Sequence, residues 1–239
     1  MLGIIVQLLI SWLIIWFFEK GNLSFLGFYP TKKRLIGLAV FFIVTAFCCS
    51  SGFFMRMLFA QQQWELNPKL TFNTILTGTW WNIKSVLFEE LIFRGVLFYI
   101  LIKKLGHTRA IIISAIVFGM YHWFSHEVIG NITQMAITFI TTGIMGLVYA
   151  FAYSKTFSLF FPIAIHLGWN ITTSVIFSAG NIGDGLFTPV KPVQEVQVGY
   201  FTYFCILFVP MLSAIFINYF MLKRMQQQPI PRPQHLHNQ

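Results

Sequence analysis

Two adjacent carboxylates and an arginine lie in a segment of this sequence that is otherwise apolar. Glu89 and Glu90 are neighbours, and Arg94 follows four residues after the second of them, in a chain with only seven acidic residues among 239. A charged side chain at the centre of a membrane helix costs roughly 2.5–3.5 kcal/mol to insert, so such residues mark function by default. Helical spacing of four places Glu90 and Arg94 on one face, where they can pair. Glu89 is turned by about 100° and stays available for other partners.

Three further polar side chains lie in two other apolar segments. His122 ends one of these segments, and His166 and Asn170 lie inside the other, four residues apart and therefore on one helical face. A carboxylate in a low-dielectric site can act as a general base near neutral pH. Glu89 and His122 can together activate a water molecule, while the ring of His166 and the amide of Asn170 can donate hydrogen bonds to an oxyanion. These groups suit amide hydrolysis without a covalent intermediate.

Two other kinds of chemistry compete with direct water activation. Glu89, His122 and His166 also form a two-histidine, one-carboxylate set of the kind that binds Zn²⁺ in hydrolases. The chain has no His-Glu-x-x-His motif, and we expect His126, one turn after His122, to be an interfacial residue. The residues leave the choice between a metal and direct acid–base catalysis open. A serine nucleophile is disfavoured, because Ser85, Ser114 and Ser174 have no evident base partner in the sequence.

The composition indicates the environment in which this chemistry takes place. Hydrophobic residues make up 56% of the chain and charged residues only 10%, with a mean hydropathy of +0.71. Soluble domains carry roughly 25% charged residues. The composition therefore excludes a soluble fold, a disordered chain and a soluble nucleic-acid binder, despite the net charge of +9. We predict an all-α, polytopic membrane protein whose surroundings are membrane lipids, with no nucleic-acid partner.

Runs of about 20 apolar residues are long enough to cross a membrane as helices. We predict about seven such spans, at residues 1–18, 35–59, 73–102, 110–124, 132–153, 157–179 and 199–222. The third is too long for one straight span. We expect an interfacial helix over 70–82, with the membrane span beginning near Ile83, and a missed or split span would give eight.

The distribution of basic residues predicts the orientation of these spans. Eleven Lys and Arg residues fall on one side and three on the other, so we expect the N-terminus outside and the C-terminus inside. With a rise of 1.5 Å per residue, Glu89 then lies roughly 21 Å, His122 roughly 18 Å, His166 roughly 15 Å and Asn170 roughly 21 Å from the cytoplasmic ends of their spans. All four are predicted to share one layer of the membrane.

We expect the chain to form a single transmembrane domain over 1–225, with the motif residues in a core at 80–180. The segment 226–239 is rich in Gln and Pro and is predicted to be a disordered cytoplasmic tail.

Three short motifs in a fixed order resemble those of a known family. They are EELIFR at 89–94, FGMYH at 118–122 and HLGWN at 166–170, each on a separate hydrophobic segment. Each motif alone is weak, but the three together are fairly specific. This resembles the CPBP family of intramembrane proteases, named for CAAX proteases and bacteriocin-processing enzymes and also called Abi. The resemblance covers about residues 80–180.

The resemblance implies an all-α membrane fold with a cavity among the motif helices. In the family's usual assignment the first Glu and first His activate water, which falls on Glu89 and His122. The second His and the Asn form the oxyanion site, which falls on His166 and Asn170. The family is often labelled metalloprotease, which implies Zn²⁺, although a mechanism without a metal is also argued for it.

In the same assignment Glu90 and Arg94 are supporting residues. Family substrates include prenylated CAAX proteins, and many bacterial members are linked to bacteriocin maturation or self-immunity. We therefore expect an intramembrane endopeptidase of the bacterial plasma membrane that acts on a membrane-associated peptide or a lipidated protein. The alternatives are a non-catalytic scaffold or bacteriocin self-immunity protein, and a proton-coupled carrier that uses Glu89, Glu90 and Arg94 as a relay.

Overall fold

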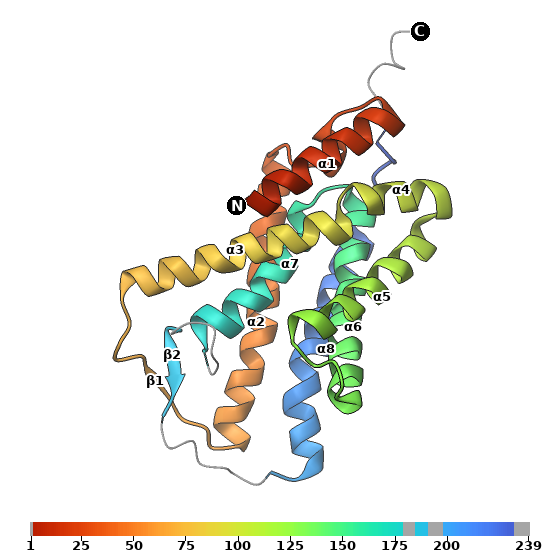
Figure 1. Ribbon diagram of the computed structural model, residues 1–239. Coiled ribbons are helices and arrows are strands. Elements are labelled where there is room, and N and C mark those ends of the chain that lie inside the picture. The colour runs from red at the N-terminus through yellow and green to blue at the C-terminus, as the bar shows by residue number, and fades with distance from the viewer. Residues whose placement is uncertain (1, 179–184, 191–197, 232–239) are drawn as a thin grey trace. The chain divides into compact units, whose positions relative to one another are not determined.

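The structure is a computed structural model, and it describes residues 2–178, 185–190 and 198–231. Helices make up most of this part of the chain, which confirms the all-α class (Figure 1). The helices are α1 (Leu2–Glu19), α2 (Lys32–Phe59), α3 (Phe72–Arg94), α4 (Val96–Leu105), α5 (His107–Ser125), α6 (Ile132–Thr156), α7 (Phe160–Ile171) and α8 (Tyr200–Arg224). The shorter elements are the 3₁₀ turn η1 (Leu23–Leu26), the π-helical turn η2 (Thr172–Ile176) and two antiparallel strands, β1 (Trp64–Leu66) and β2 (Phe187–Pro189).

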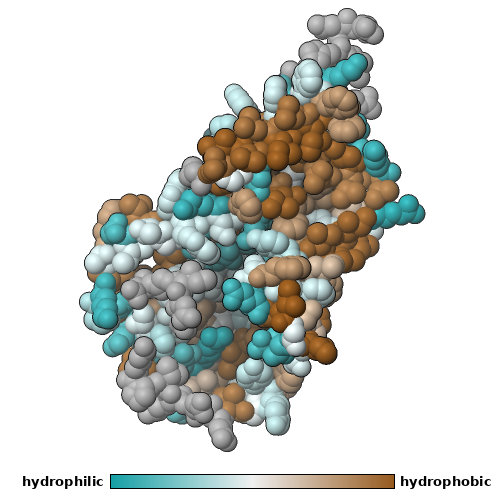
Figure 2. Space-filling model, viewed as in Figure 1, coloured by the Kyte–Doolittle hydropathy of each residue, from teal (hydrophilic) through white to brown (hydrophobic). Residues whose placement is uncertain are grey.

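Among the described residues, α1, α2, α6 and α8 are long and apolar enough to cross a membrane. The visible surface of α1 is largely apolar in Figure 2. Its residues Leu2 and Phe17 are 76% and 73% exposed. Exposed apolar surface of this kind is favourable against lipid and costly against water. Helix α3 is not among the four, and its sequence combines Asn and Thr residues in the first half with charged residues from Lys84 to Arg94. The count of seven spans and the orientation stay predictions.

The long third segment breaks at a different place from the one predicted. The expected separate interfacial helix over 70–82 is wrong, because α3 runs unbroken from Phe72 to Arg94 and the break falls at Gly95. The polar residues of this segment do not end the helix, since Asn82 Nδ2 donates to Gly78 O within it at 2.8 Å. At Gly95 a Cβ atom would lie 2.0 Å from Leu91 O, so only glycine can form this junction between α3 and α4.

The described chain forms two compact units. Unit 1 contains the described residues of Met1–Leu38, Leu87–Ile163 and Tyr219–Gln239, and unit 2 those of Ala39–Val86 and Ala164–Asn218. That residues 1–225 form one transmembrane domain stays a prediction.

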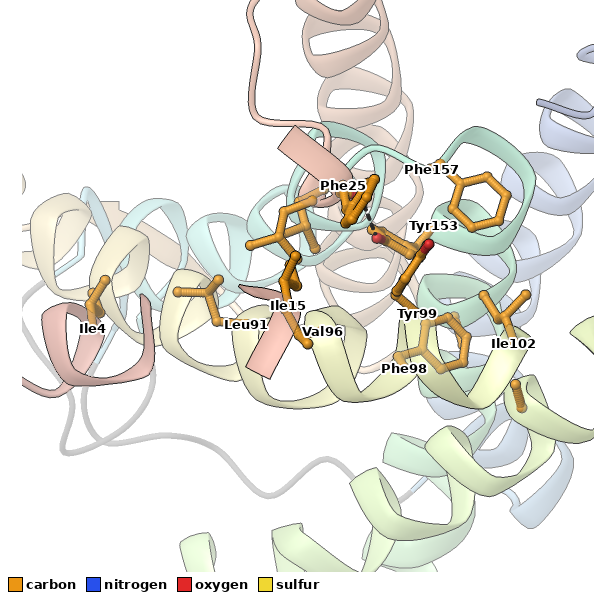
Figure 3. Close-up of a cluster of buried hydrophobic side chains, with 14 residues drawn as sticks. Ile4, Ile15, Phe25, Leu91, Val96, Phe98, Tyr99, Ile102, Tyr153 and Phe157 are labelled. Atoms are coloured by element: carbon orange, nitrogen blue, oxygen red, sulfur yellow. Dashed lines mark hydrogen bonds between the residues drawn. The ribbon is translucent and has the colours of Figure 1, made fainter. Parts of the chain in front are cut away.

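The core of unit 1 joins α1, η1, α4 and α6 around stacked aromatic rings (Figure 3). The rings of Phe25 and Tyr99 stack with 5.1 Å between their centres. The hydroxyl of Tyr153 donates to Phe25 O at 2.9 Å. Tyr153 has no exposed surface, so its polar end needs this partner. In the same unit α5 packs along α6. This core holds α4 and α6 at fixed positions, and these helices flank the motif residues of α3 and α5.

The first residues of the predicted disordered tail form hydrogen bonds with the rest of unit 1. Gln227 Nε2 donates to Ser154 O at 2.8 Å, the Gln228 amide donates to Lys155 O at 3.0 Å, and the Tyr99 hydroxyl donates to Pro231 O at 2.8 Å. The last carbonyls of α6 lack partners within their own helix, which explains why glutamine donors bind there. Residues 226–231 therefore contact unit 1, the disorder of 226–239 stays a prediction, and 232–239 lie outside the described residues.

Unit 2 contains a buried polar link and an aromatic cluster. Asn218 Nδ2 of α8 donates to Thr45 Oγ1 of α2 at 2.9 Å, and neither residue has exposed surface. The rings of Phe53 and Phe177 stack at 4.3 Å, with Trp64 of β1 against both. Polar contacts between membrane helices of this kind fix their register.

Candidate active site

The predicted ion pair between Glu90 and Arg94 is present in the last turn of α3. Arg94 Nη1 donates to Glu90 Oε1 at 3.3 Å, and both side chains are 0% exposed. An isolated charge at such a position would be very costly, so each group depends on the other. The pairing follows directly from the helical spacing of four residues.

Arg94 also contacts helices α5 and α6. The sequence did not predict these contacts. Arg94 Nη2 donates to Gly146 O of α6 at 3.0 Å. Its Cζ lies 4.2 Å from the ring centre of Phe118 on α5 and 5.2 Å from that of Tyr149 on α6. Cation–π attraction is strongest where the cation is removed from water, as here. Arg94 is thus the point at which α3, α5 and α6 meet.

Glu89 and His122 form the second pair. Glu89 Oε2 lies 3.9 Å from His122 Nε2, and both side chains are largely buried. This distance is too long for a direct hydrogen bond, and it suits a water molecule bound between the two atoms. The structure therefore brings together a carboxylate and an imidazole from α3 and α5, as the sequence predicted for these two residues.

The tautomer of the neutral His122 ring follows from its other contact. His122 Nδ1 lies 2.8 Å from Phe118 O, one turn earlier in α5. A carbonyl oxygen only accepts hydrogen bonds, so Nδ1 carries the hydrogen and Nε2 of the neutral ring presents a lone pair. The ring centres of Phe118 and Tyr121 lie 4.5 and 5.4 Å from the centre of the imidazole, and these contacts fix its orientation. Two acceptors, the lone pair of Nε2 and the Glu89 carboxylate, consequently face the same gap.

His166 and Asn170 lie one turn apart on α7, in unit 2. His166 is 4% exposed, and Asn170 is half-buried. The carbonyl of Asn170 accepts from Ser174 Oγ at 2.5 Å, within the π-helical turn η2 that follows α7. Turns of this type often occur at functional sites. The placement of these two residues opposite Glu89 and His122 of unit 1 stays a prediction.

Two of the serines considered in the sequence donate to backbone carbonyls, and the absence of a serine nucleophile stays a prediction. Ser114 Oγ donates to Phe93 O at 2.9 Å, and Ser174 Oγ likewise bonds a backbone carbonyl. One pair that the sequence did not indicate joins α5 to α6, where Ser154 Oγ lies 2.7 Å from His107 Nδ1. Ser154 is only 2% exposed, so a substrate carbonyl cannot reach it. This contact links two helices, and we assign it no catalytic part.

The predicted zinc ligands belong to two different units. Within each unit, the described His, Cys, Asp and Glu side chains include no group of three that could hold a metal ion. Glu89 and His122 supply two ligands of the type that zinc accepts, and catalytic zinc sites use three from the protein. The predicted third ligand, His166, belongs to unit 2. The ring of His126, one turn after His122, meets the His122 ring edge-on, with 5.2 Å between the two ring centres.

Comparison with known families gives one match. The model of a family described as type II CAAX prenyl endopeptidase Rce1-like matches residues 2–172, which is well over half of the chain. The matched stretch contains all three motifs, from Glu89 to Asn170. No curated protein and no solved structure matches the chain.

Proposed function

The chain belongs to the Rce1-like family of type II CAAX prenyl endopeptidases, and from this premise we propose that Glu89 and His122 activate the water that cleaves its substrate. Membership confirms the family indicated by the three motifs and makes the chain a CAAX-type endopeptidase of the membrane. The observation that carries the proposal is the gap of 3.9 Å between Glu89 Oε2 and His122 Nε2, which two acceptors face. The substrate we propose is a membrane-associated or lipidated polypeptide.

A water molecule in this gap donates one O–H group to the Glu89 carboxylate and the other to His122 Nε2. As the water oxygen attacks the carbonyl carbon of the scissile bond, Glu89 takes its proton and the carbonyl oxygen becomes an oxyanion. Glu89 then gives the proton to the nitrogen of the leaving amine, and the C–N bond breaks. The hydrogen bond from His122 Nδ1 to Phe118 O keeps Nε2 aimed at the water throughout.

The oxyanion needs donors on the opposite side of the scissile bond. We propose that the His166 ring and the Asn170 amide supply them, in agreement with their spacing of one helical turn and with the burial of His166. Loss of one such donor typically costs 10²–10³ in kcat. Glu90 has a different part in this scheme, because Arg94 neutralises it and leaves Glu89 as the reactive carboxylate of the pair.

Zn²⁺, if bound by Glu89, His122 and His166, would supply Lewis-acid activation of the same water. The lone pair on His122 Nε2 and the Glu89 carboxylate are suitable donors for it. We further propose that the chain lies in a bacterial plasma membrane with its N-terminus outside, as the distribution of basic residues predicts.

The test is cleavage of a farnesylated peptide with a CAAX end by the purified protein in lipid vesicles. We expect Glu89→Gln to lower kcat by 10²–10⁴, because it keeps the shape of the side chain and removes the base. Glu65→Gln, at an exposed position of β1, is the matched control and should cleave like the wild type. Equal cleavage by Glu89→Gln and the wild type would overturn the proposal.

A chelation arm distinguishes the two forms of the mechanism. If 1,10-phenanthroline leaves cleavage intact, the direct Glu89–His122 mechanism stands. If cleavage is lost and Zn²⁺ restores it, the zinc form replaces it. A wild type that cleaves nothing, tested on peptides with and without the prenyl group, would favour a non-catalytic scaffold or self-immunity protein.

A further inference from the structure

We infer that Gly146 and Tyr149 of α6 are positioning residues, which act through Arg94 and Glu90 to hold Glu89 against His122. Neither residue belongs to a motif, and neither contacts the proposed water site. The inference rests on the proposed function, because it concerns the geometry of the Glu89–His122 pair. It begins from the fact that Arg94 is the last residue of α3, directly before the break at Gly95.

The end of a helix is its least constrained part, since its last carbonyls lack partners within the helix. Glu89 and Glu90 lie in the last two turns of α3, so their positions depend on what fixes this end. The contacts of Arg94 with α5 and α6 supply that anchor. A shift of about 1 Å in a catalytic group can cost on the order of 100-fold in rate, so the anchor matters for the reaction.

Gly146 provides the space that Arg94 occupies. Its carbonyl accepts from Arg94 Nη2 at 3.0 Å. A Cβ atom added to Gly146 would lie 2.9 Å from Phe118 Cδ1 and 3.2 Å from Arg94 Nη2. Gly143, about one turn earlier on the same helix, differs, because a Cβ there would meet only Ala115 O, at 3.6 Å, which is ordinary contact. Alanine at 146 therefore displaces the anchor, whereas alanine at 143 does not.

Tyr149 encloses the same guanidinium with its ring. The ring centre lies 5.2 Å from Arg94 Cζ and 5.9 Å from the centre of the Phe118 ring, which it meets edge-on. Tyr149 is 2% exposed, so the cation sits among buried aromatic rings with Gly146 O and Glu90 as polar partners. The cation–π contact is made by the ring.

Phe118 connects the anchor to the other half of the pair. Its ring lies over Arg94, and its carbonyl accepts from His122 Nδ1. A side chain at position 146 presses on the Phe118 ring as well as on Arg94. The change therefore reaches both Glu89, through α3, and His122, through α5.

The first test compares Gly146→Ala with Gly143→Ala in the vesicle assay. We expect Gly146→Ala to lower kcat on the order of 10–100-fold with KM nearly unchanged, because the displaced groups act in the reaction and not in substrate binding. Gly143→Ala should stay within about twofold of the wild type, since it adds no close contact. Equal kcat values for the two variants would overturn the inference.

The second test reads the anchor without relying on activity. In the Glu89→Gln background Glu90 is the one remaining acidic residue of α3, and dicyclohexylcarbodiimide modifies protonated carboxyl groups in membranes. Paired with Arg94 and without exposed surface, Glu90 should not react. Adding Gly146→Ala should separate the pair and open the carboxyl of Glu90 to the reagent, so that it is modified. Adding Gly143→Ala should leave Glu90 unmodified, and modification equal in the two variants would contradict the inference.

Tyr149 gives an independent arm in case Gly146→Ala does not insert into the membrane. Tyr149→Phe keeps the ring over Arg94, so its kcat should fall less than that of Tyr149→Leu, which should lose on the order of tenfold and expose Glu90 to the carbodiimide. Equal behaviour of the two would overturn the role of the ring. Failure of the proposed function can be told apart from failure of this inference. In the first case Glu89→Gln would not change cleavage, and the carbodiimide experiment would still report whether Gly146 and Tyr149 hold Arg94 against Glu90.

Discussion

The two neighbouring carboxylates of α3 lie in opposite environments. Glu90 has no exposed surface and pairs with Arg94, which three aromatic rings and a backbone carbonyl surround. Glu89 is turned toward His122 across a gap that suits a water molecule. The comparison shows how one helix turn can hold a structural charge and a reactive one side by side. The Arg94 cation neutralises Glu90, whereas Glu89 faces the lone pair on His122 Nε2.

The largest effect that tests this difference is expected when each of the two carboxylates is replaced by an amide, one at a time. Glu89→Gln should lower kcat by 10²–10⁴ with little change in the thermal unfolding midpoint. Glu90→Gln should instead lower the stability, because it leaves Arg94 buried without its anion. Both are measured on the purified protein, by cleavage and by thermal unfolding. Similar profiles for the two variants would break the comparison.

Removing the cation tests the structural half of the comparison. Arg94→Met should destabilise the protein by about 3–5 kcal/mol, because Glu90 then lacks its partner. The double variant Arg94→Met, Glu90→Gln should regain much of this loss, since no buried charge remains. Thermal unfolding of the single and double variants in the same detergent measures the difference. A double variant no more stable than Arg94→Met alone would show that the pair is not coupled.

A smaller effect is expected where the two environments meet, at Phe118. Phe118→Leu removes the ring over Arg94 but keeps the carbonyl that accepts from His122 Nδ1. We expect a loss of stability on the order of 1–2 kcal/mol from the missing cation–π contact. The rate should fall less than in Glu89→Gln, because His122 keeps its orientation. A rate loss as large as that of Glu89→Gln would mean that the ring itself belongs to the catalytic machinery.

The local part of this site follows from the sequence. Spacing of four residues is enough to predict the Glu90–Arg94 pair and the different direction of Glu89, because both depend only on helical geometry. The same holds for the bond from His122 Nδ1 to Phe118 O, which lies within one turn of α5. The approach of Glu89 to His122 is a contact between helices, and the family motifs indicated it.

The remaining features depend on contacts that no local pattern encodes. Gly146 and Tyr149 come from a helix without a motif, and their role follows only from the packing of α6 against α5. Gly95 is visible in the sequence, but its break depends on a backbone conformation that brings it close to Leu91 O. The composition of 226–231 indicates disorder, yet the free carbonyls at the end of α6 bind this segment.

The central claim is that the chain cleaves proteins in its own membrane through Glu89. The most direct measurement is a comparison of protein termini, by mass spectrometry, in membranes from cells that carry either the wild type or Glu89→Gln at equal levels. The account predicts new termini that appear only with the wild type and that belong to membrane-associated or lipidated proteins. Identical sets of termini in the two membranes would contradict it.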